Sequence, residues 1–107
     1  MKFNKILIIR LSSIGDIILS TPLVRAIWKK YPSAVIDFAI KKEYALLMQH
    51  NPYINNLIIV DREYMQESKQ IIKKNKYDCI INIQKSSRAT QLISNVGSTL
   101  VTTYSKE

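Results

Sequence analysis

The stretch that decides the fold is residues 5–22, KILIIRLSSIGDIILSTP. It opens with a nearly unbroken apolar run, Lys5–Arg10, which is typical of a strand covered on both faces of a parallel sheet. A polar loop, Leu11–Asp16, follows. Asp16–Tyr31 then carries apolar residues at helical spacing and ends before Pro32, which predicts a crossover helix. A buried strand, a polar loop and a helix in this order begin a doubly wound α/β fold.

Pro22 interrupts this helical pattern, because a proline inside a helix costs about 3 kcal/mol. Either the helix kinks at Pro22, or Thr21 caps a second helical segment with Pro22 at its first position. The sequence leaves both possibilities open.

The same alternation continues along the chain. Four more apolar runs predict strands, the last one weaker: Val35–Ile40, Leu57–Val60, Cys79–Ile83 and Thr99–Tyr104. Three more helices are expected between them, the last ended by Gly97: Lys42–Gln49, Glu63–Lys76 and Ser87–Asn95. The fold class is therefore α/β, a Rossmann-like, doubly wound parallel sheet with the common strand order 3-2-1-4-5.

Helical spacing also predicts which side chains face the core. In the first helix these are Ile17, Val24, Ile27, Trp28 and Tyr31, and in Glu63–Lys76 they are Tyr64, Ile71 and Ile72.

Composition sets limits on the architecture and the location. With 107 residues, of which 47% are hydrophobic and 22% charged, the chain is one globular domain, residues 1–107, able to hold a core. The longest apolar stretch is interrupted by Arg10 and Asp16, so we expect neither a membrane span nor a secretory signal. The single cysteine, Cys79, lies in an apolar run and is expected to be a buried hydrophobe in the reducing cytosol.

The balance of 16 Lys and Arg against 8 Asp and Glu, a formal charge of +8, favours anionic partners. Lys29–Lys30 and Lys73–Lys76 close helices, where they complement the helix dipole. Other cations follow strand ends: Arg10, Lys41, Lys42, Arg62, Lys85 and Arg88. Among them we expect Lys85 and Arg88 to contact a phosphate of the substrate, with a solvated loop as the alternative. His50, beside Asn51–Pro52, is expected in a turn without a metal or catalytic role.

The strand order brings two loops side by side. Strands one and four are neighbours at the switch point, so the loops that follow them should together bind a ligand. The candidate binding residues are Ser12, Ser13, Gly15, Gln84, Lys85 and Arg88. A dinucleotide site would need about three glycines in the first loop, and a P-loop would need Gly-Lys-Ser/Thr, so nicotinamide, flavin adenine and ATP sites are not favoured.

Asp16 has two interpretations. Ser13 and Asp16 fit the [ST]-x-x-[DE] capping box, in which each side chain satisfies an N–H of the first helical turn. Alternatively, Asp16 faces the crevice as a general base. The helix dipole lowers the pKa of Asp16 by less than one unit, so it would be an ionised but weak base at neutral pH.

Lys5–Pro22 resembles the opening of the glycosyltransferase family 9 enzymes, the heptosyltransferase-like enzymes of bacterial lipopolysaccharide assembly. The resemblance continues through Tyr31–Pro32, His50–Ile54, Tyr77–Ile81 and Arg88. Asn82 departs from the family pattern, because relatives commonly carry an acidic residue in the fourth strand.

This resemblance implies that the chain is the N-terminal, acceptor-side part of a longer two-domain enzyme of the GT-B type, and that it is inactive alone. It implies that Asp16 deprotonates the acceptor hydroxyl in an inverting, metal-independent transfer of heptose. The implied partners are the lipopolysaccharide core acceptor and an ADP-heptose donor, which a C-terminal domain mainly binds. No other cofactor and no nucleic acid are expected. The implied location is cytoplasmic, with peripheral contact to the inner membrane.

Two other function classes stay open from the residues alone. The +8 charge suits a nucleic-acid-binding module, although no helix-turn-helix, RNA-recognition or finger motif is present. A flavodoxin-like fold could instead use Ser12 and Ser13 to hold a flavin phosphate.

Overall fold

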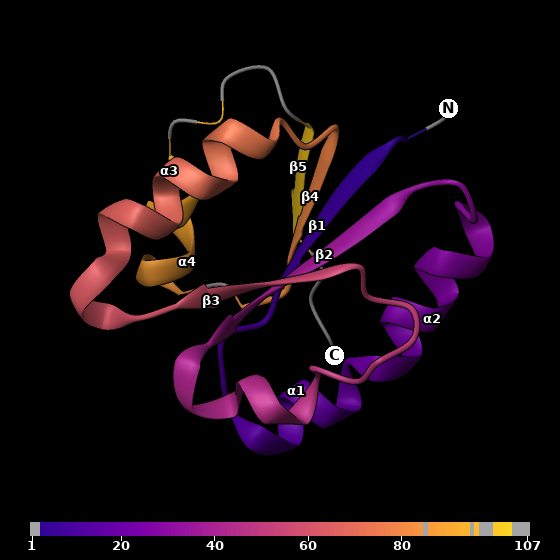
Figure 1. Ribbon diagram of the computed structural model, residues 1–107, viewed down its shortest axis with the longest axis horizontal. Coiled ribbons are helices and arrows are strands. Elements are labelled where there is room, and N and C mark those ends of the chain that lie inside the picture. Colours follow the sequence, from indigo (N-terminus) through magenta and orange to yellow (C-terminus); the bar gives the residue numbers. More distant parts are fainter. Residues whose placement is uncertain (1–2, 85, 95, 97–99, 104–107) are drawn as a thin grey trace.

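The computed structural model describes residues 3–84, 86–94, 96 and 100–103. These residues form one parallel five-stranded sheet in the order β3-β2-β1-β4-β5 (Figure 1), which confirms the predicted doubly wound topology. The strands are β1 (Lys5–Ile9), β2 (Val35–Lys41), β3 (Asn56–Val60), β4 (Cys79–Asn82) and β5 (Leu100–Thr103). Both ends of each of the first four strands lie within one residue of the predicted ends. Thr99 and Tyr104, the expected ends of the fifth strand, are outside the described residues.

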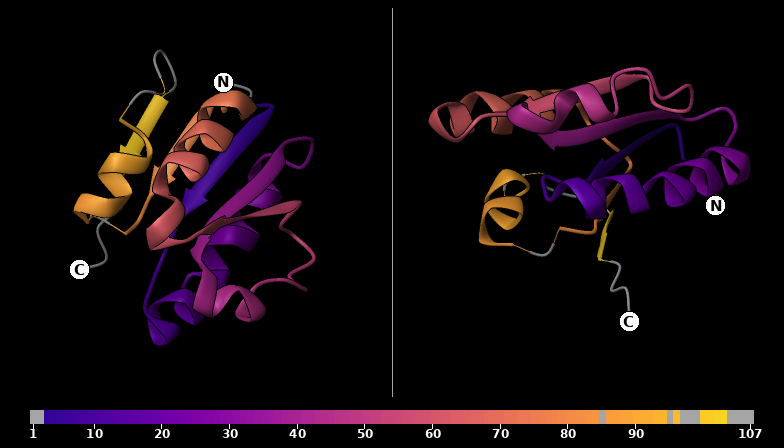
Figure 2. Two further views of the ribbon diagram at one scale, coloured as in Figure 1. Left: turned by 60° about the vertical axis from the view of Figure 1, so that its left-hand side comes forward. Right: turned by 90° about the horizontal axis from the view of Figure 1, so that it is seen from below.

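The helices cover both faces of the sheet. They are α1 (Ile14–Leu19), α2 (Thr21–Lys30), α3 (Met65–Asn75) and α4 (Ser87–Leu92), with 3-10 helices η1 (Lys42–Leu47) and η2 (Arg62–Tyr64). Helices α1 and α2 lie on one side of the sheet, and α3 and α4 lie on the other, as Figures 1 and 2 show.

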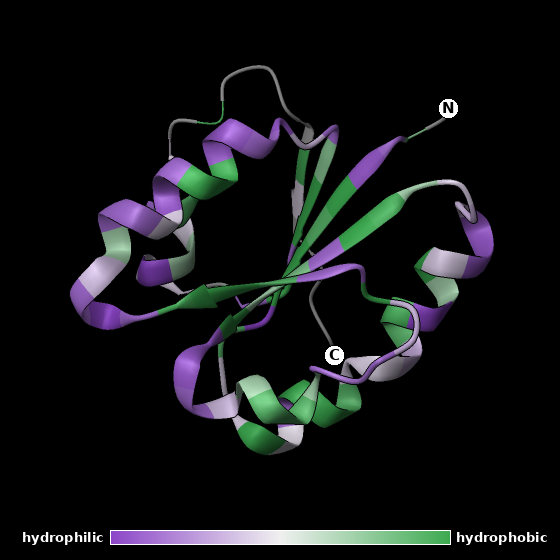
Figure 3. Ribbon diagram, in the orientation of Figure 1, coloured by the Kyte–Doolittle hydropathy of each residue, from purple (hydrophilic) through white to green (hydrophobic). Residues whose placement is uncertain are grey.

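The central strand β1 explains why its sequence is apolar at every position. Ile6 and Ile8 pack in the cluster that includes Ile17 of α1. Leu7 and Ile9 pack in the opposite cluster, which includes Ile72 of α3. Because successive side chains of a strand point to opposite faces, a strand covered on both sides must be apolar throughout. Figure 3 shows the inner strands as hydrophobic and the outer side of α3 as hydrophilic.

The structure resolves the alternative posed by Pro22 in favour of two helices. Ser20 is the C-cap of α1 and also the N-cap of α2, and Pro22 lies in the first turn of α2. There its missing N–H removes no helical hydrogen bond. The predicted cap was one residue late, since Thr21 is already helical and its hydroxyl donates to the Ile18 carbonyl oxygen at 2.9 Å.

Some predicted core positions are wrong. Tyr64 is 55% exposed and Ile71 is 46% exposed, whereas Ile72 is buried as predicted. The helical pattern is divided at Tyr64 between η2 and α3, and the inward line of α3 runs through Ser68 and Ile72. Trp28 is also wrong as a core residue, because it is 39% exposed and packs against the ring of Tyr53.

Three other expectations concern helix ends and Cys79. The predicted helix Lys42–Gln49 is the shorter 3-10 helix η1, Lys42–Leu47. Helix α4 ends at Leu92, earlier than predicted, and Asn95 and Gly97 are outside the described residues. Cys79 is free and buried, and burial raises the pKa of its thiol.

Within the described ranges, no helix combines the length and the apolar character that crossing a bilayer requires.

Candidate functional site

The loops after β1 and β4 meet at the carboxyl edge of the sheet, as predicted. Ile9 of β1 is paired with Asn82 of β4, and the backbone N–H of Ile83 donates to the Ile9 carbonyl oxygen at 3.1 Å. Residues 10–13 and 83–86 therefore leave the sheet next to each other. This is the switch point at which ligands of doubly wound folds bind.

Gln84 fixes the first loop to the second. Its Oε1 accepts the backbone N–H of Leu11 at 3.0 Å and that of Ser12 at 3.2 Å, and its Nε2 donates to Ser12 Oγ at 3.3 Å. The peptide bond between Ser12 and Ser13 is cis. Gln84 was predicted to bind substrate, but its amide is used within the protein. Its observed contribution is to hold the backbone of the β1 loop in place.

Asp16 is held by two neighbours through a single carboxylate oxygen. Its Oδ2 lies 2.8 Å from Arg10 Nη2 and accepts the Ser13 hydroxyl at 3.1 Å. Arg10 is anchored in turn, since its Nη1 donates to the Ile83 carbonyl oxygen at 2.6 Å and its side chain is only 18% exposed. The Asp16 side chain is 49% exposed. Because both contacts converge on Oδ2, Oδ1 is the oxygen that can accept a proton from a ligand.

The capping-box prediction is wrong for the Ser13 side chain. Ser13 is the N-cap of α1, but its hydroxyl makes no capping bond to a backbone N–H and points to the Asp16 carboxylate instead. That hydrogen bond is the largest cause of the lowered pKa of Asp16, followed by the charge and the hydrogen bond of Arg10. Asp16 is therefore ionised at neutral pH, as predicted, and is a weak base. The main causes are these two side chains, with a smaller contribution from a hydrogen bond of the Ser13 backbone, and the dipole argument included none of them.

A polar hollow of about 330 Å³ lies between α4 and the β1 loop that precedes Asp16. Three of the predicted binding residues, Ser12, Gln84 and Arg88, line it together. Ser86 borders it and caps α4, with its Oγ accepting the Ala89 N–H at 3.2 Å. The hollow therefore offers hydroxyl and amide groups and one guanidinium, which suits a hydroxyl-rich ligand with an anionic group.

Gly15 and Lys85 remain from the predicted set. A Cβ added at Gly15 would meet no other atom within 4 Å, so packing within the protein does not require a glycine there. Lys85 is outside the described residues.

The cations predicted at this edge are partly neutralised. Lys41 lies 3.6 Å from Glu43, and Lys42 lies 3.6 Å from Asp61. Arg88 and Arg62 have no carboxylate within salt-bridge distance in the part of the chain that the structure describes. Since Arg88 also lines the hollow, it is the described cation at this edge of the sheet that is best placed to contact a phosphate.

Sequence reasoning missed Arg10 as the partner of Asp16. The spacing of six residues from a strand end to a helix does not indicate a contact by itself. The position of Arg10 directly after a buried strand, in the loop that precedes Asp16, was the available indication.

Comparison with known proteins identifies the relatives of this chain. No protein-family model matches the sequence. Over 78 residues, 64% of the chain, it is 31% identical to lipopolysaccharide heptosyltransferase 3 of Escherichia coli, of which the match covers 23%. The predicted resemblance to glycosyltransferase family 9 is confirmed. A family 9 glycosyl transferase from Veillonella parvula superposes on 97% of the chain with a TM-score of 0.83 and 24% identity. The ADP-heptose lipopolysaccharide heptosyltransferase II of E. coli superposes on 92% with a TM-score of 0.79 and 24% identity.

These family 9 structures show that the fold is shared. The chain spans about a third of each, 33% and 30%, and about a quarter of the curated relative. The roles of Asp16 and of the hollow in a reaction stay predictions.

Proposed function

We propose that this chain is the acceptor-side part of a glycosyltransferase of the heptosyltransferase type, with Asp16 as the general base. The observation that carries the proposal is the half-exposed Asp16 carboxylate at the switch point, fixed through Oδ2 by Arg10 and Ser13. The relatives named above are a lipopolysaccharide heptosyltransferase and an ADP-heptose lipopolysaccharide heptosyltransferase. They support ADP-heptose as donor and the lipopolysaccharide core as acceptor.

The proposed reaction is a single displacement that inverts the anomeric centre. The acceptor hydroxyl binds Asp16 Oδ1, and its oxygen forms the new bond to the anomeric carbon of the donor. The bond from that carbon to the diphosphate breaks, and ADP leaves with the electron pair. The hydroxyl proton moves to Asp16. Because the lowered pKa makes Asp16 a weak base, this transfer occurs late, when the attacking oxygen has become acidic.

The other residues of the site have positioning and binding roles in this proposal. Arg10 keeps the carboxylate ionised and correctly oriented, and Gln84 holds the loop. Ser12 and Arg88 contact the acceptor in the hollow. The chain spans about a third of the related structures, and we infer that the donor nucleotide and diphosphate bind mainly to parts that correspond to the rest of their length. We therefore expect these 107 residues alone to transfer no sugar.

The test is a chimera in which this chain replaces the segment of E. coli heptosyltransferase II that it resembles. We expect heptose transfer, and we expect Asp16→Asn to lower kcat by about 10²–10⁴-fold, the usual contribution of a general base. Glu43→Gln is the matched control, because Glu43 is another exposed carboxylate at the same sheet edge. Transfer that survives Asp16→Asn would show that the base is assigned wrongly.

We also propose peripheral contact with the cytoplasmic face of a membrane. Five large apolar side chains are 42–77% exposed on α1 and the adjacent η1: Ile14, Ile18, Leu19, Leu46 and Leu47. Figure 3 shows the corresponding hydrophobic segment of α1. The patch borders Asp16, so its insertion would bring a lipid-anchored acceptor to the base. The formal charge of +8 favours an anionic bilayer.

Vesicle sedimentation tests this contact. We expect binding to vesicles of phosphatidylcholine with phosphatidylglycerol, and we expect Leu46→Ser to reduce it. Ile71→Ser is the control, since Ile71 is another exposed large apolar residue and lies on α3, across the sheet. Equal effects of the two substitutions would exclude the patch as the membrane contact.

A further inference from the structure

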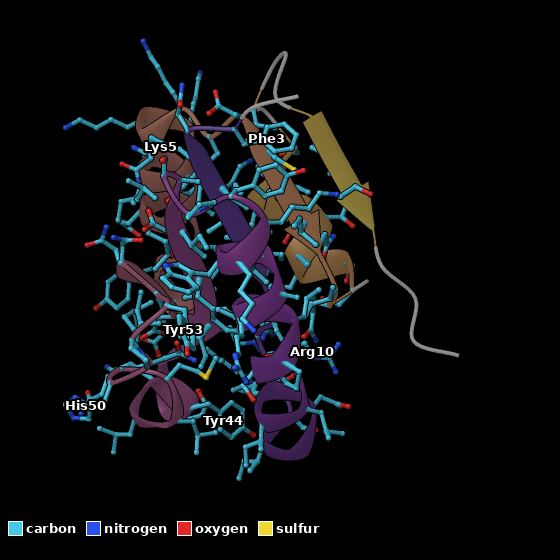
Figure 4. All side chains as sticks on the ribbon, turned by 90° about the vertical axis from the view of Figure 1, so that its right-hand side faces the viewer. Phe3, Lys5, Arg10, Tyr44, His50 and Tyr53 are labelled. Carbon is cyan, nitrogen blue, oxygen red and sulfur yellow. The ribbon has the colours of Figure 1, made fainter. Side chains whose placement is uncertain are left out.

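A second hollow lies on the α2 side of the sheet, apart from the residues assigned above. It measures about 540 Å³ and runs between α2 and the segment before β3. Arg25 and Lys29 border it from α2, and Asn51 and Tyr53 border it from the other side. We call these four residues and their hollow the α2 groove. Figure 4 shows Tyr53 beside the purple helical segment formed by α1 and α2.

The charges of the α2 groove are not balanced by the protein. Arg25 and Lys29 are one helical turn apart, so their side chains are neighbours and repel each other. Neither lies within salt-bridge distance of a carboxylate among the described residues, and both are exposed. Lys29 is in the last turn of α2 and gains from the helix dipole, but Arg25 is not. An anion between them would relieve this repulsion.

The opposite wall of the α2 groove is preorganised. The Tyr53 ring packs on Trp28 of α2, with ring centroids 4.9 Å apart. The Tyr53 backbone N–H donates to Asn51 Oδ1 at 2.8 Å, which orients the Asn51 amide and leaves its Nδ2 as a donor. A half-buried aromatic ring next to an oriented amide is a surface on which a sugar can bind, because sugars have both apolar C–H faces and hydroxyl groups.

We propose that the α2 groove binds a phosphate group carried on a carbohydrate. Arg25 and Lys29 contact the phosphate, and Asn51 and Tyr53 contact the sugar ring. Given the function proposed above, this group belongs to the acceptor. Asp16 and Arg25 are nine residues apart on consecutive helices, which is about 13.5 Å of helical rise. An acceptor of several sugars spans this distance and a single sugar does not.

Titration of the 107-residue chain with hexose 6-phosphate, followed by amide NMR, tests the site. We expect shifts at Arg25, Lys29, Asn51 and Tyr53, and weaker binding of both inorganic phosphate and the unphosphorylated hexose. Arg25→Ala and Lys29→Ala should each weaken binding by about tenfold, as the loss of one charge-assisted hydrogen bond does. Lys74→Ala is the matched control, because it removes one exposed positive charge from α3 on the other face.

Three outcomes would overturn the proposal. Equal weakening by Lys74→Ala would mean attraction by net charge alone. Inorganic phosphate that binds as tightly as the hexose phosphate would exclude the sugar contact. Binding to phosphatidylglycerol vesicles that depends on Arg25 and Lys29, without binding of the hexose phosphate, would identify a bilayer headgroup instead.

The chimera separates this inference from the proposed function. There Arg25→Ala should raise the KM for the acceptor and leave kcat unchanged, whereas Asp16→Asn should lower kcat and leave hexose phosphate binding intact. If the hexose phosphate does not bind while Asp16→Asn still abolishes transfer, the α2 groove is assigned wrongly and the base is assigned correctly. If the hexose phosphate binds while transfer survives Asp16→Asn, the base is assigned wrongly and the α2 groove is assigned correctly.

Discussion

Removing one hydroxyl from the buried network around Asp37 should lower the stability of the protein measurably. Asp37 lies in the middle of the sheet and is 2% exposed. Its Oδ2 accepts the Tyr77 hydroxyl at 2.7 Å, and its Oδ1 accepts Asn56 Nδ2 at 3.0 Å. Asn75 Nδ2 donates to the Tyr77 oxygen at 2.9 Å. Tyr77→Phe therefore takes a donor from a buried carboxylate and an acceptor from Asn75.

The size of the effect follows from these contacts. A buried polar group left without its partner costs about 1–3 kcal/mol, and a carboxylate belongs in the upper half of that range. For a domain near 100 residues, 1 kcal/mol changes Tm by about 4–8 °C. Tyr77→Phe should therefore lower Tm by about 10–20 °C.

Thermal unfolding followed by circular dichroism at pH 7 measures this shift. Tyr44→Phe is the matched control: Tyr44 packs against the core, and its hydroxyl makes no hydrogen bond in the described part of the chain. It should lower Tm much less. Equal Tm values for the two variants would refute the assignment of the stabilisation to the Asp37 network.

Alkaline pH provides a second measurement on the same variant. Burial and the hydrogen bond to Asp37 raise the pKa of Tyr77 above its ordinary value of 10.0. Since the folded state holds this proton more tightly, the stabilisation is complete below pH 10 and is lost as the pH rises further. As the pH rises above 10, the native protein should therefore lose stability more steeply than Tyr77→Phe does.

Three further predictions concern the candidate site. Arg10→Gln should raise the pKa of Asp16, because it removes a neighbouring positive charge and a hydrogen bond. The stability that ionised Asp16 provides is lost as pH falls through this pKa, so in the variant it should be lost at a higher pH. NMR titration of the Asp16 carboxyl measures the change. Gly15→Ala should raise the free energy of unfolding by about 0.5–1 kcal/mol in urea, because alanine favours a helix and its Cβ meets open space; a concurrent loss of transfer in the chimera would show that the acceptor occupies this space. Gln84→Ala should lower the free energy of unfolding by about 1–3 kcal/mol and speed hydrogen exchange at the Leu11 amide. Unchanged exchange would mean that Gln84 does not hold the loop.

The sheet was predictable because its physical cause is local in the sequence. β1, β2 and β4 are covered on both faces, so burial alone makes their residues apolar, and short runs of isoleucine and valine show it directly. The strand order followed from the common doubly wound topology. Together these placed the β1 and β4 loops side by side, and with them Ser12, Gln84 and Arg88.

The site chemistry was less predictable, because it depends on the paths of long side chains. Arg10 and Gln84 both reach across to another loop, and no spacing rule relates them to Asp16 or Leu11. Asp37 was not recognised either, since one acid inside an apolar run gives no indication of its partners Asn56 and Tyr77, which are distant in sequence.

Ile17 is the one side chain of helix α1 that is buried in the core. Ile17 is fully buried, whereas Ile14, Ile18 and Leu19 are more than half exposed. The packing of Ile17, an apolar side chain with no chemical role, therefore helps to position the neighbouring Asp16 carboxylate. A substitution that shortens the Ile17 side chain would shift the Asp16 carboxylate, and a misplacement of about 1 Å can lower the reaction rate 10²-fold. A mutational scan would then find a sensitive position directly beside the reacting group, at a residue that no substrate touches.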